Sequence, residues 1–218
     1  MPANYNLDNL TARDHNKTIL QKELSLTIDP RVPLFGMVSR MDNQKGVDLV
    51  PDAFRKIARQ PWQAVILGTG DAVIEAAVRR LETEFPEQVR AAIRFDAALS
   101  RRIFGGVDAL LIPSRYEPCG LTQMIAMRYG CIPLARATGG LRDTIIDFKR
   151  SDRSTGFLFH KASPEAFART LRRSINAYRN PEAWRDIQGR GMSQDFSWEH
   201  SARQYLALYH ALVKNQRV

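Results

Sequence analysis

Short apolar runs alternate with longer amphipathic stretches from Leu34 to Phe159, and this alternation constrains the fold more than any other feature of the chain. Each run has the length of a strand, and its continuous apolar character is typical of a strand buried on both faces. Strands that alternate with helices in this way form βαβ units. We therefore predict an α/β fold, a doubly wound parallel sheet of about six strands. The expected strands are Leu34 to Val38, Ala64 to Leu67, Ala92 to Phe95, Ala109 to Ile112, Ile132 to Ala135 and Gly156 to Phe159.

The pattern divides the chain into three segments. Residues 1–30 are polar and are expected to form an N-terminal segment with one short helix, from His15 to Leu24. Residues 31–180 contain all the expected strands and form the sheet domain. Residues 181–218 have only helical patterns and are predicted to be a C-terminal helical tail, which must pack on the flank of the domain or on a partner.

Composition limits the classes of function. A chain of 218 residues that is 44% hydrophobic can bury one good-sized core. Its net charge of +9 favours an acidic partner, which includes nucleic acid, an anionic surface and a phosphorylated small molecule. The basic residues are scattered and form no arginine-rich arm, so we expect no nucleic-acid partner.

The two cysteines, Cys119 and Cys131, have no metal-like spacing, and we expect reduced thiols and no metal site. The first residues show neither a basic leader nor an apolar core, and no apolar run approaches membrane length. The sequence therefore predicts a soluble cytoplasmic protein without a membrane partner.

The string from Ser114 to Gln123 places a carboxylate and a thiol on a glycine turn between an apolar run and a helix. Gly120 allows backbone to approach a bound group closely, and Thr122 offers an N-cap hydroxyl for the helix. In α/β folds, ligands bind at such strand-to-helix loops. Glu117 is the candidate ligand contact, with a structural helix-end charge as the alternative. Cys119 is not assigned as a nucleophile, because nothing in the sequence indicates a lowered pKa.

A second loop brings two cations to the start of a helix. Arg40 and Lys45 follow the first strand, and Gly46 opens the next helix, an arrangement that suits a phosphate. In a sheet of order 3-2-1-4-5-6, the loops after strands one and four flank the switch point. We expect these cations and Glu117 to meet in one crevice, although an isolated pair of such cations would more often be solvated surface.

Two weaker signals lie at the same predicted edge. Gly139 and Gly140 form a glycine turn after the fifth strand, and a pair of this kind is more often simply a turn. Phe95 ends the third predicted strand, where an aromatic ring either stacks on a nucleobase or fills the core.

These motifs together resemble the carboxyl-terminal half of bacterial glycogen synthases and plant starch synthases, retaining glucosyltransferases built from two Rossmann-like domains. The resemblance rests on Val38-Ser39-Arg40 with Gln44-Lys45-Gly46, on the string from Pro113 to Gln123, and on Thr138-Gly139-Gly140-Leu141. It covers nearly the whole chain, and Glu-Pro-Cys-Gly-Leu is its most specific element.

The resemblance implies transfer of glucose from ADP-glucose or UDP-glucose to the nonreducing end of an α-1,4-glucan, with retention. Arg40 and Lys45 would hold the diphosphate, Glu117 would contact the sugar, and no metal or other cofactor would be needed. Further substrate contacts implied by the resemblance are Phe95, Cys119, Gly120, Leu121, Thr122, Gly139 and Gly140.

Two departures refine this interpretation. Many related transferases carry a second Glu where this chain has Ile125, and the glycogen and starch synthase branch also lacks it. The family's Lys-X-Gly-Gly-Leu element belongs to its amino-terminal half, and here the nearest string begins with Thr138. We therefore expect a donor-binding domain that alone binds nucleotide weakly and transfers nothing, with the glucan held by the amino-terminal domain.

Three alternatives stay open at this point. The chain is compatible with another retaining transferase, such as a sucrose-handling one. It is also compatible with a basic module that binds nucleic acid or polyphosphate, against which the scattered charges argue. A glucan-binding scaffold with a dead site is the third, and the presence of Arg40, Lys45 and Glu117 argues against it.

Overall fold

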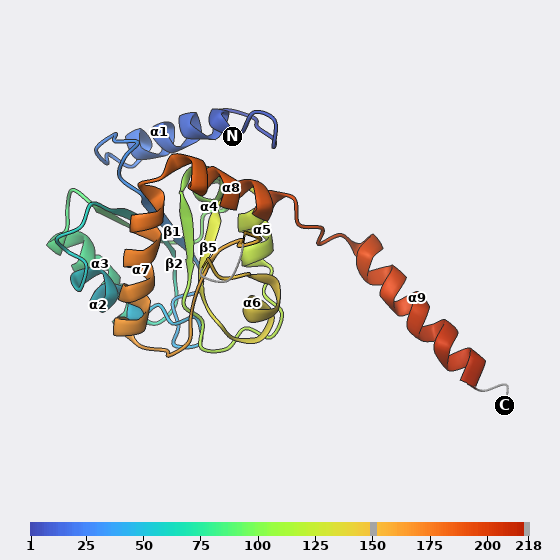
Figure 1. The fold of residues 1–218 in the computed structure, drawn as a ribbon. Coiled ribbons are helices and arrows are strands. Elements are labelled where there is room, and N and C mark those ends of the chain that lie inside the picture. Colours follow the sequence, from blue (N-terminus) through green and yellow to red (C-terminus); the bar gives the residue numbers. More distant parts are fainter. Residues whose placement is uncertain (149–151, 216–218) are drawn as a thin grey trace.

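A computed structural model describes residues 1–148 and 152–215 of the chain (Figure 1). Within these residues six strands form one parallel sheet in the order β3-β2-β1-β4-β5-β6. The predicted doubly wound sheet and its strand order are confirmed. The strands are β1 (Leu34–Val38), β2 (Gln63–Gly68), β3 (Val89–Ile93), β4 (Ala109–Ile112), β5 (Ile132–Arg136) and β6 (Phe157–Phe159).

Helices cover both faces of the sheet. One core lies beneath α2 (Leu49–Arg55), α3 (Ala72–Glu84), α7 (Pro164–Tyr178) and α8 (Pro181–Met192). The other lies beneath α1 (Arg13–Glu23), α4 (Ala97–Gly106), α5 (Thr122–Arg128) and α6 (Gly139–Thr144), with a short 3-10 turn, η1 (Leu10–Ala12), before α1. In β1, Phe35 and Met37 enter the first core and Leu34 the second, which explains why the strand is apolar throughout.

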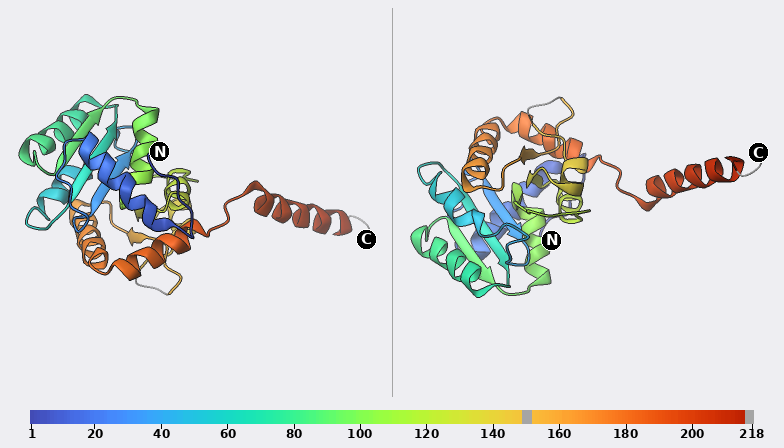
Figure 2. Two further views of the ribbon diagram at one scale, coloured as in Figure 1. Left: turned by 90° about the horizontal axis from the view of Figure 1, so that it is seen from above. Right: turned by 90° about the horizontal axis from the view of Figure 1, so that it is seen from below.

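The predicted tail divides into two parts. α8 packs on α5, α7 and β5, so it belongs to the sheet domain. The last helix, α9 (Trp198–Asn215), extends away from the domain in every view (Figures 1 and 2). Its large apolar side chains, among them Trp198, Tyr205 and Leu212, are exposed.

Two expected elements differ from the structure. The third strand ends at Ile93, so Phe95 lies in the loop before α4 rather than in the strand, and its side chain is 88% exposed. The first long helix begins at Arg13 rather than at the predicted His15, and most of its buried residues are polar. These include Asn16, Lys17 and Gln21, which a search for apolar periodicity does not detect.

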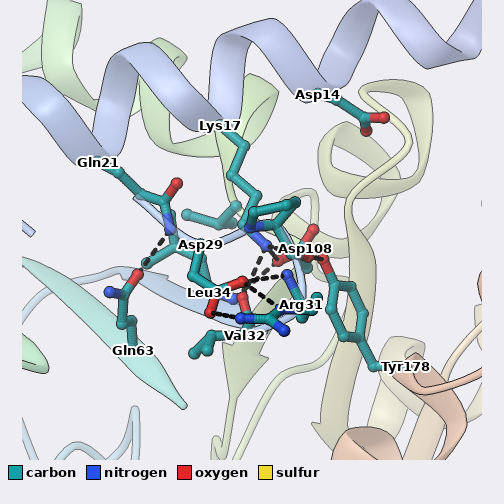
Figure 3. A network of polar contacts seen from close by, with 12 residues as sticks. Asp14, Lys17, Gln21, Asp29, Arg31, Val32, Leu34, Gln63, Asp108 and Tyr178 are labelled. Atoms are coloured by element: carbon teal, nitrogen blue, oxygen red, sulfur yellow. Dashed lines mark hydrogen bonds and ion pairs between the residues drawn. The ribbon is translucent and has the colours of Figure 1, made fainter. Parts of the chain in front are cut away.

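Lys17 forms a buried ion pair at the amino edge of the sheet (Figure 3). Its Nζ lies 2.7 Å from Asp108 Oδ2, and the two side chains are 6% and 7% exposed. The same ammonium donates to the Val32 carbonyl and to the Tyr178 hydroxyl, both at 2.7 Å. Asp108 also accepts from the Leu34 amide at 2.7 Å. This network joins α1, the starts of β1 and β4, and the end of α7.

Tyr178 completes the network as a neutral donor. Burial, together with the Asp108 carboxylate, raises the pKa of Tyr178 above its ordinary value. The phenol therefore stays protonated and donates to the Pro30 carbonyl at 2.7 Å.

Replacing Lys17 with Met should lower the free energy of unfolding by about 3–5 kcal/mol, because it leaves the Asp108 carboxylate buried and unpaired. Urea unfolding followed by circular dichroism measures the change. The matched control is Arg203→Ala, which removes an exposed ion pair with Glu199 and should cost at most about 0.5 kcal/mol. A loss for Lys17→Met as small as that of the control would contradict the assigned role.

Candidate functional site

The loops after β1 and β4 touch through their backbones at the carboxyl edge of the sheet. Gly46 has a φ of +69°, and a Cβ at this position would lie 2.2 Å from the Pro113 carbonyl oxygen. The Arg115 amide donates to the Gln44 carbonyl at 2.8 Å. Glycine is therefore required at position 46 for the two loops to meet.

Arg115 clamps the same two loops with its side chain. Its guanidinium donates to both carboxylate oxygens of Asp48, at 2.6 and 2.7 Å, and to the Asn43 carbonyl at 2.7 Å. The hydrogen bonds with Asp48 raise the pKa of Arg115. Arg136, the last residue of β5, donates to the carbonyls of Ser114 and Arg115, which ties the end of this strand to the clamp.

Lys45 and Glu117 form the centre of the site. Lys45 Nζ lies 2.7 Å from Glu117 Oε2, and the side chains are 22% and 14% exposed. Ser114 Oγ donates to the same carboxylate oxygen at 3.0 Å. Arg40 and Thr122 line a cavity of about 210 Å³ together with this pair. The structure thus brings Arg40, Lys45 and Glu117 to one cavity, from loops more than 70 positions apart in the sequence.

A larger cavity, of about 680 Å³, adjoins the first. The two share Val38, Ser39 and Arg40 as lining residues. Phe95 stands at the larger cavity, whose walls are mainly apolar and come from the ends of β1 and β2 and from α4 and α5. A cationic chamber that continues into an apolar one suits a ligand in which a diphosphate joins an aromatic base.

Gly139 and Gly140 support the Glu117 loop from behind. A Cβ on Gly139 would lie 2.1 Å from the Glu117 carbonyl oxygen, and one on Gly140 would lie 1.7 Å from the Cys119 carbonyl oxygen. The Gly140 amide donates to the Glu117 carbonyl at 3.1 Å. Among the described residues, neither glycine is part of the lining of the two cavities. Their close contact is with backbone of the loop that carries Glu117.

The start of α5 differs from the expectation in one respect. Thr122 was expected to cap the helix, but the N-cap residue is Leu121, which is already in helical conformation, and no side chain caps this end. Thr122 is the first helical residue and lines the smaller cavity. Gly120 is buried with a φ of +74°, while Cys119 and Leu121 are exposed at the surface of the loop.

Gln123 is a functional candidate that the sequence analysis did not single out. Its side chain is buried, and Nε2 donates to the Gly120 carbonyl at 2.7 Å and to Thr144 Oγ1 at 3.1 Å. This amide holds the glycine turn against α6. Asp48, Arg115 and Arg136 were missed as well, because a buried or paired polar residue adds nothing to an apolar periodic pattern.

Metal and membrane features are absent from the part of the chain that the structure describes. No group of three or more His, Cys, Asp or Glu side chains there is arranged to hold a metal ion. None of the helices in residues 1–148 and 152–215 has the length and apolar character required to cross a bilayer.

A doubly wound sheet with ligand cavities at its switch point defines a Rossmann-like α/β domain. The sequence profile of glycosyl transferases group 1 matches residues 21–188, and the chain belongs to this family.

Its relatives include glycogen synthases. The enzyme of Anaeromyxobacter dehalogenans (strain 2CP-1) is 45% identical over 213 residues, covering 98% of this chain and 45% of the relative. The glycogen synthase of Serratia proteamaculans is 41% identical over 216 residues, which cover 97% of this chain and 45% of that relative. The chain therefore spans just under half the length of these relatives.

Solved structures agree. The catalytic domain of starch synthase IV from Arabidopsis thaliana, bound to ADP and acarbose, is 38% identical with a TM-score of 0.89, covering 98% of this chain and 45% of that one. Sucrose-phosphate synthase from Thermosynechococcus elongatus is 25% identical with a TM-score of 0.66, and the match covers 90% of this chain and 49% of that one. The resemblance to glycogen and starch synthases found in the sequence is confirmed.

Gly140→Ala should displace the Glu117 loop, since the new methyl group would collide with the Cys119 carbonyl. We expect a loss of about 1–3 kcal/mol in the free energy of unfolding, measured with urea. Gly189→Ala is the matched control, because Gly189 lies within α8 and an added Cβ would meet nothing within 4 Å apart from the backbone of its own helix. It should stabilise the chain by about 0.5–1 kcal/mol. Equal changes in the free energy of unfolding for the two substitutions would contradict this expectation, because the loop would then accommodate the methyl group at position 140 without loss of stability.

The two thiols should differ in reactivity. Cys131 is fully buried, and burial raises its pKa to about 12 from the ordinary value of 9.0. At pH 8 a maleimide should therefore modify one thiol per folded chain, the exposed Cys119, and two after unfolding. Mass spectrometry of the labelled protein measures this, and Cys119→Ser should abolish labelling of the folded chain. Modification of Cys131 in the folded state would contradict its enclosure.

Proposed function

We propose that this chain is the donor-binding domain of a glycogen or starch synthase that transfers glucose from ADP-glucose to the nonreducing end of an α-1,4-glucan with retention. The observation that carries the proposal is the meeting of Arg40, Lys45 and Glu117 in a cavity that continues into an apolar chamber beside Phe95. The glycogen synthase relatives and the ADP-bound starch synthase neighbour support it.

The cations act on the leaving nucleotide. In the free site Glu117 is the anion that pairs with Lys45. When a nucleotide sugar binds, its diphosphate replaces Glu117 as the partner of Lys45. Arg40, which lines the same cavity, binds the diphosphate as well. Both cations then stabilise the charge that develops on the diphosphate as the glycosidic bond breaks. These two side chains supply the positive charge without a metal or other cofactor.

Glu117 acts on the sugar. Its carboxylate is released from Lys45 beside the anomeric carbon, where it stabilises positive charge and contacts sugar hydroxyls. Ser114 keeps one carboxylate oxygen in place through its 3.0 Å hydrogen bond. Backbone around Gly120, Leu121 and Thr122 contacts the sugar or the phosphate, and Cys119 lies in the same turn. Gly139 and Gly140 pack against the backbone of this loop and fix its position.

The nucleobase lies against Phe95. Its ring is free on the cavity side, where it can stack on a planar base. We favour adenine over uracil because the relatives are bacterial glycogen synthases and the starch synthase neighbour holds ADP.

The acceptor glucan requires the part of the relatives that this chain does not cover. The chain spans 45% of their length, so we propose that alone it binds the nucleotide weakly and transfers no glucose. We also propose a cytoplasmic protein that uses neither nucleic acid nor membrane as a partner. A sucrose-handling transferase is the second candidate, and the lower similarity to sucrose-phosphate synthase places it behind a glucan synthase.

Calorimetric titration of the chain with ADP, UDP and ADP-glucose tests the proposal. We expect saturable binding of ADP and ADP-glucose, and weaker binding of UDP. Mixed oligonucleotides serve as the control for a general anion site. Oligonucleotide binding that weakens steeply with salt, in the absence of ADP binding, would reject the proposal in favour of a basic nucleic-acid module.

Substitutions in the ion pair should change ADP affinity in opposite directions. Lys45→Ala removes a charged hydrogen-bond donor to the diphosphate and should cost about 1.5–3 kcal/mol of binding free energy. Glu117→Gln removes the anion that competes for Lys45 and should tighten ADP binding several-fold. In the complete enzyme, Arg40→Ala, Lys45→Ala and Glu117→Gln should each lower kcat/KM, the first two by about 2–4 kcal/mol. Weaker ADP binding by Glu117→Gln would show that Glu117 positions Lys45 rather than competing for its ligand.

A further inference from the structure

Asp42 lies between the two cations of the site in the sequence and contacts both. Its Oδ1 accepts a hydrogen bond from the Lys45 amide at 2.8 Å, and its Oδ2 lies 3.4 Å from Nη2 of Arg40. Asp42 is not one of the described residues that line the two cavities. This carboxylate therefore contacts the backbone of one cation and the side chain of the other from outside the space that a ligand would fill.

The two contacts of Asp42 differ in strength. The hydrogen bond from the Lys45 amide joins residues three positions apart, as a capping side chain does at the start of a helix, and it closes the turn from Asp42 to Lys45. The Arg40 side chain is 69% exposed and its contact is long, so solvent screens most of that attraction. The main effect of Asp42 is therefore on the position of Lys45.

The start of this turn is fixed by the loop after β2. The Met41 amide donates to the Thr69 carbonyl at 3.0 Å, and the Met41 carbonyl accepts from the Asp71 amide at 2.7 Å. The Met41 side chain is buried in the first core. Asp42 therefore extends from backbone that hydrogen bonds and burial hold in place.

The end of the turn is fixed by the loop after β4. The Gly46 amide donates to the Asn43 carbonyl at 3.1 Å, and the same carbonyl accepts from Nη1 of Arg115 at 2.7 Å. Between these two anchored ends, the Asp42 carboxylate is the acceptor for the Lys45 amide. Its removal would loosen the residue that carries the ammonium while both ends of the turn stay in place.

Lys45 depends on this restraint most when a ligand is bound. In the free site its ammonium pairs with Glu117 at 2.7 Å, which holds the side chain in the cavity. Under the proposed function a diphosphate replaces Glu117, so that restraint is lost on binding. The hydrogen bond from the Lys45 amide to Asp42 does not involve the ammonium and persists. A residue that is fixed before binding loses less conformational entropy when the ligand arrives.

We propose that Asp42 is a positioning residue of the donor site, whose carboxylate fixes the turn that presents Lys45 to the diphosphate. The inference rests on the proposed function, which places the diphosphate at Lys45. Asp42 acts through Lys45 and touches no part of the nucleotide. Its acceptor oxygen matters more than its charge, because the hydrogen bond is made with a neutral amide and a negative charge beside Arg40 opposes the binding of an anion.

Calorimetric titration of the whole 218-residue chain with ADP tests this role. Asp42→Ala should weaken ADP binding by about five- to tenfold, which corresponds to the loss of one hydrogen bond. Asn180→Ala is the matched control: Asn180 accepts from the Ala183 amide at 3.1 Å, also three positions away, and it lines neither cavity. Urea unfolding should show similar losses of stability for the two variants, while ADP affinity falls only for Asp42→Ala.

Asp42→Asn separates the acceptor oxygen from the charge. Asparagine offers the same oxygen to the Lys45 amide, so ADP affinity should stay within about twofold of the unaltered chain or exceed it. An affinity for Asp42→Asn as low as that of Asp42→Ala overturns the proposal, because the hydrogen bond would then not be the cause of the effect.

A double-mutant cycle measures whether Asp42 acts through Lys45. In the Lys45→Ala background, Asp42→Ala should change ADP affinity by less than about twofold, because the ammonium that the turn presents is already gone. The full loss in both backgrounds overturns the proposal, since Asp42 would then act on the nucleotide independently of Lys45.

Failure of the inference is distinguishable from failure of the proposed function. ADP binding that Asp42→Ala weakens no more than Asn180→Ala does overturns the role of Asp42 alone. An unaltered chain that does not bind ADP overturns the donor-binding function, and the role of Asp42 with it.

Discussion

Direct backbone contact between loops at the carboxyl edge of the sheet is the constraint on which the site depends. Gly46 lets the β1 loop rest on Pro113, and Gly139 and Gly140 let the β5 turn rest on the Glu117 loop. Each contact is too close for any side chain. Arg40, Lys45 and Glu117 therefore stand on two loops that touch each other, and the turn after β5 supports the second of them. The separation of these loops is set by backbone, which moves less than side chains do.

With the loops supported in this way, a ligand can replace one partner of the ion pair between Lys45 and Glu117. Lys45 and Glu117 are opposite charges held 2.7 Å apart, mostly out of water, and each is partly desolvated. Such a pair costs solvation energy that its own attraction offsets only in part, so a ligand with stronger charge can displace one partner. The clamp between Arg115 and Asp48 keeps the loops in place while that exchange occurs. Under the proposed function, the ion pair of the free site holds Lys45 ready for a diphosphate and Glu117 ready for a sugar.

Much of the fold was predictable because the central strands bury both faces and are therefore continuous apolar runs. The edge strand β3 is only partly buried and contains Arg90, so its predicted start, Ala92, came three residues late. The strand order followed from the rules for doubly wound sheets, and that order placed the loops of Arg40 and Glu117 side by side. The sequence could not reveal polar groups that act through geometry. Lys17 and Asp108 lie 91 positions apart and have no periodic signal, and Arg115 resembles any surface arginine until its two bonds to Asp48 are seen. Thr122 is a good capping residue by type, yet the turn at Gly120 places the cap one position earlier.

The two edges of the sheet divide stability from function. At the amino edge the ammonium of Lys17 uses its donors on Asp108, Val32 and Tyr178, so that network is satisfied internally. At the carboxyl edge Arg40 is largely exposed, with one weak contact to Asp42 at 3.4 Å, and Phe95 has a free face. Helix α7 follows β6 and runs back to the amino edge, where Tyr178 at its end meets Lys17 of α1. Arg40 and Phe95 are thus accessible at the carboxyl edge, while the network at the amino edge stabilises the fold.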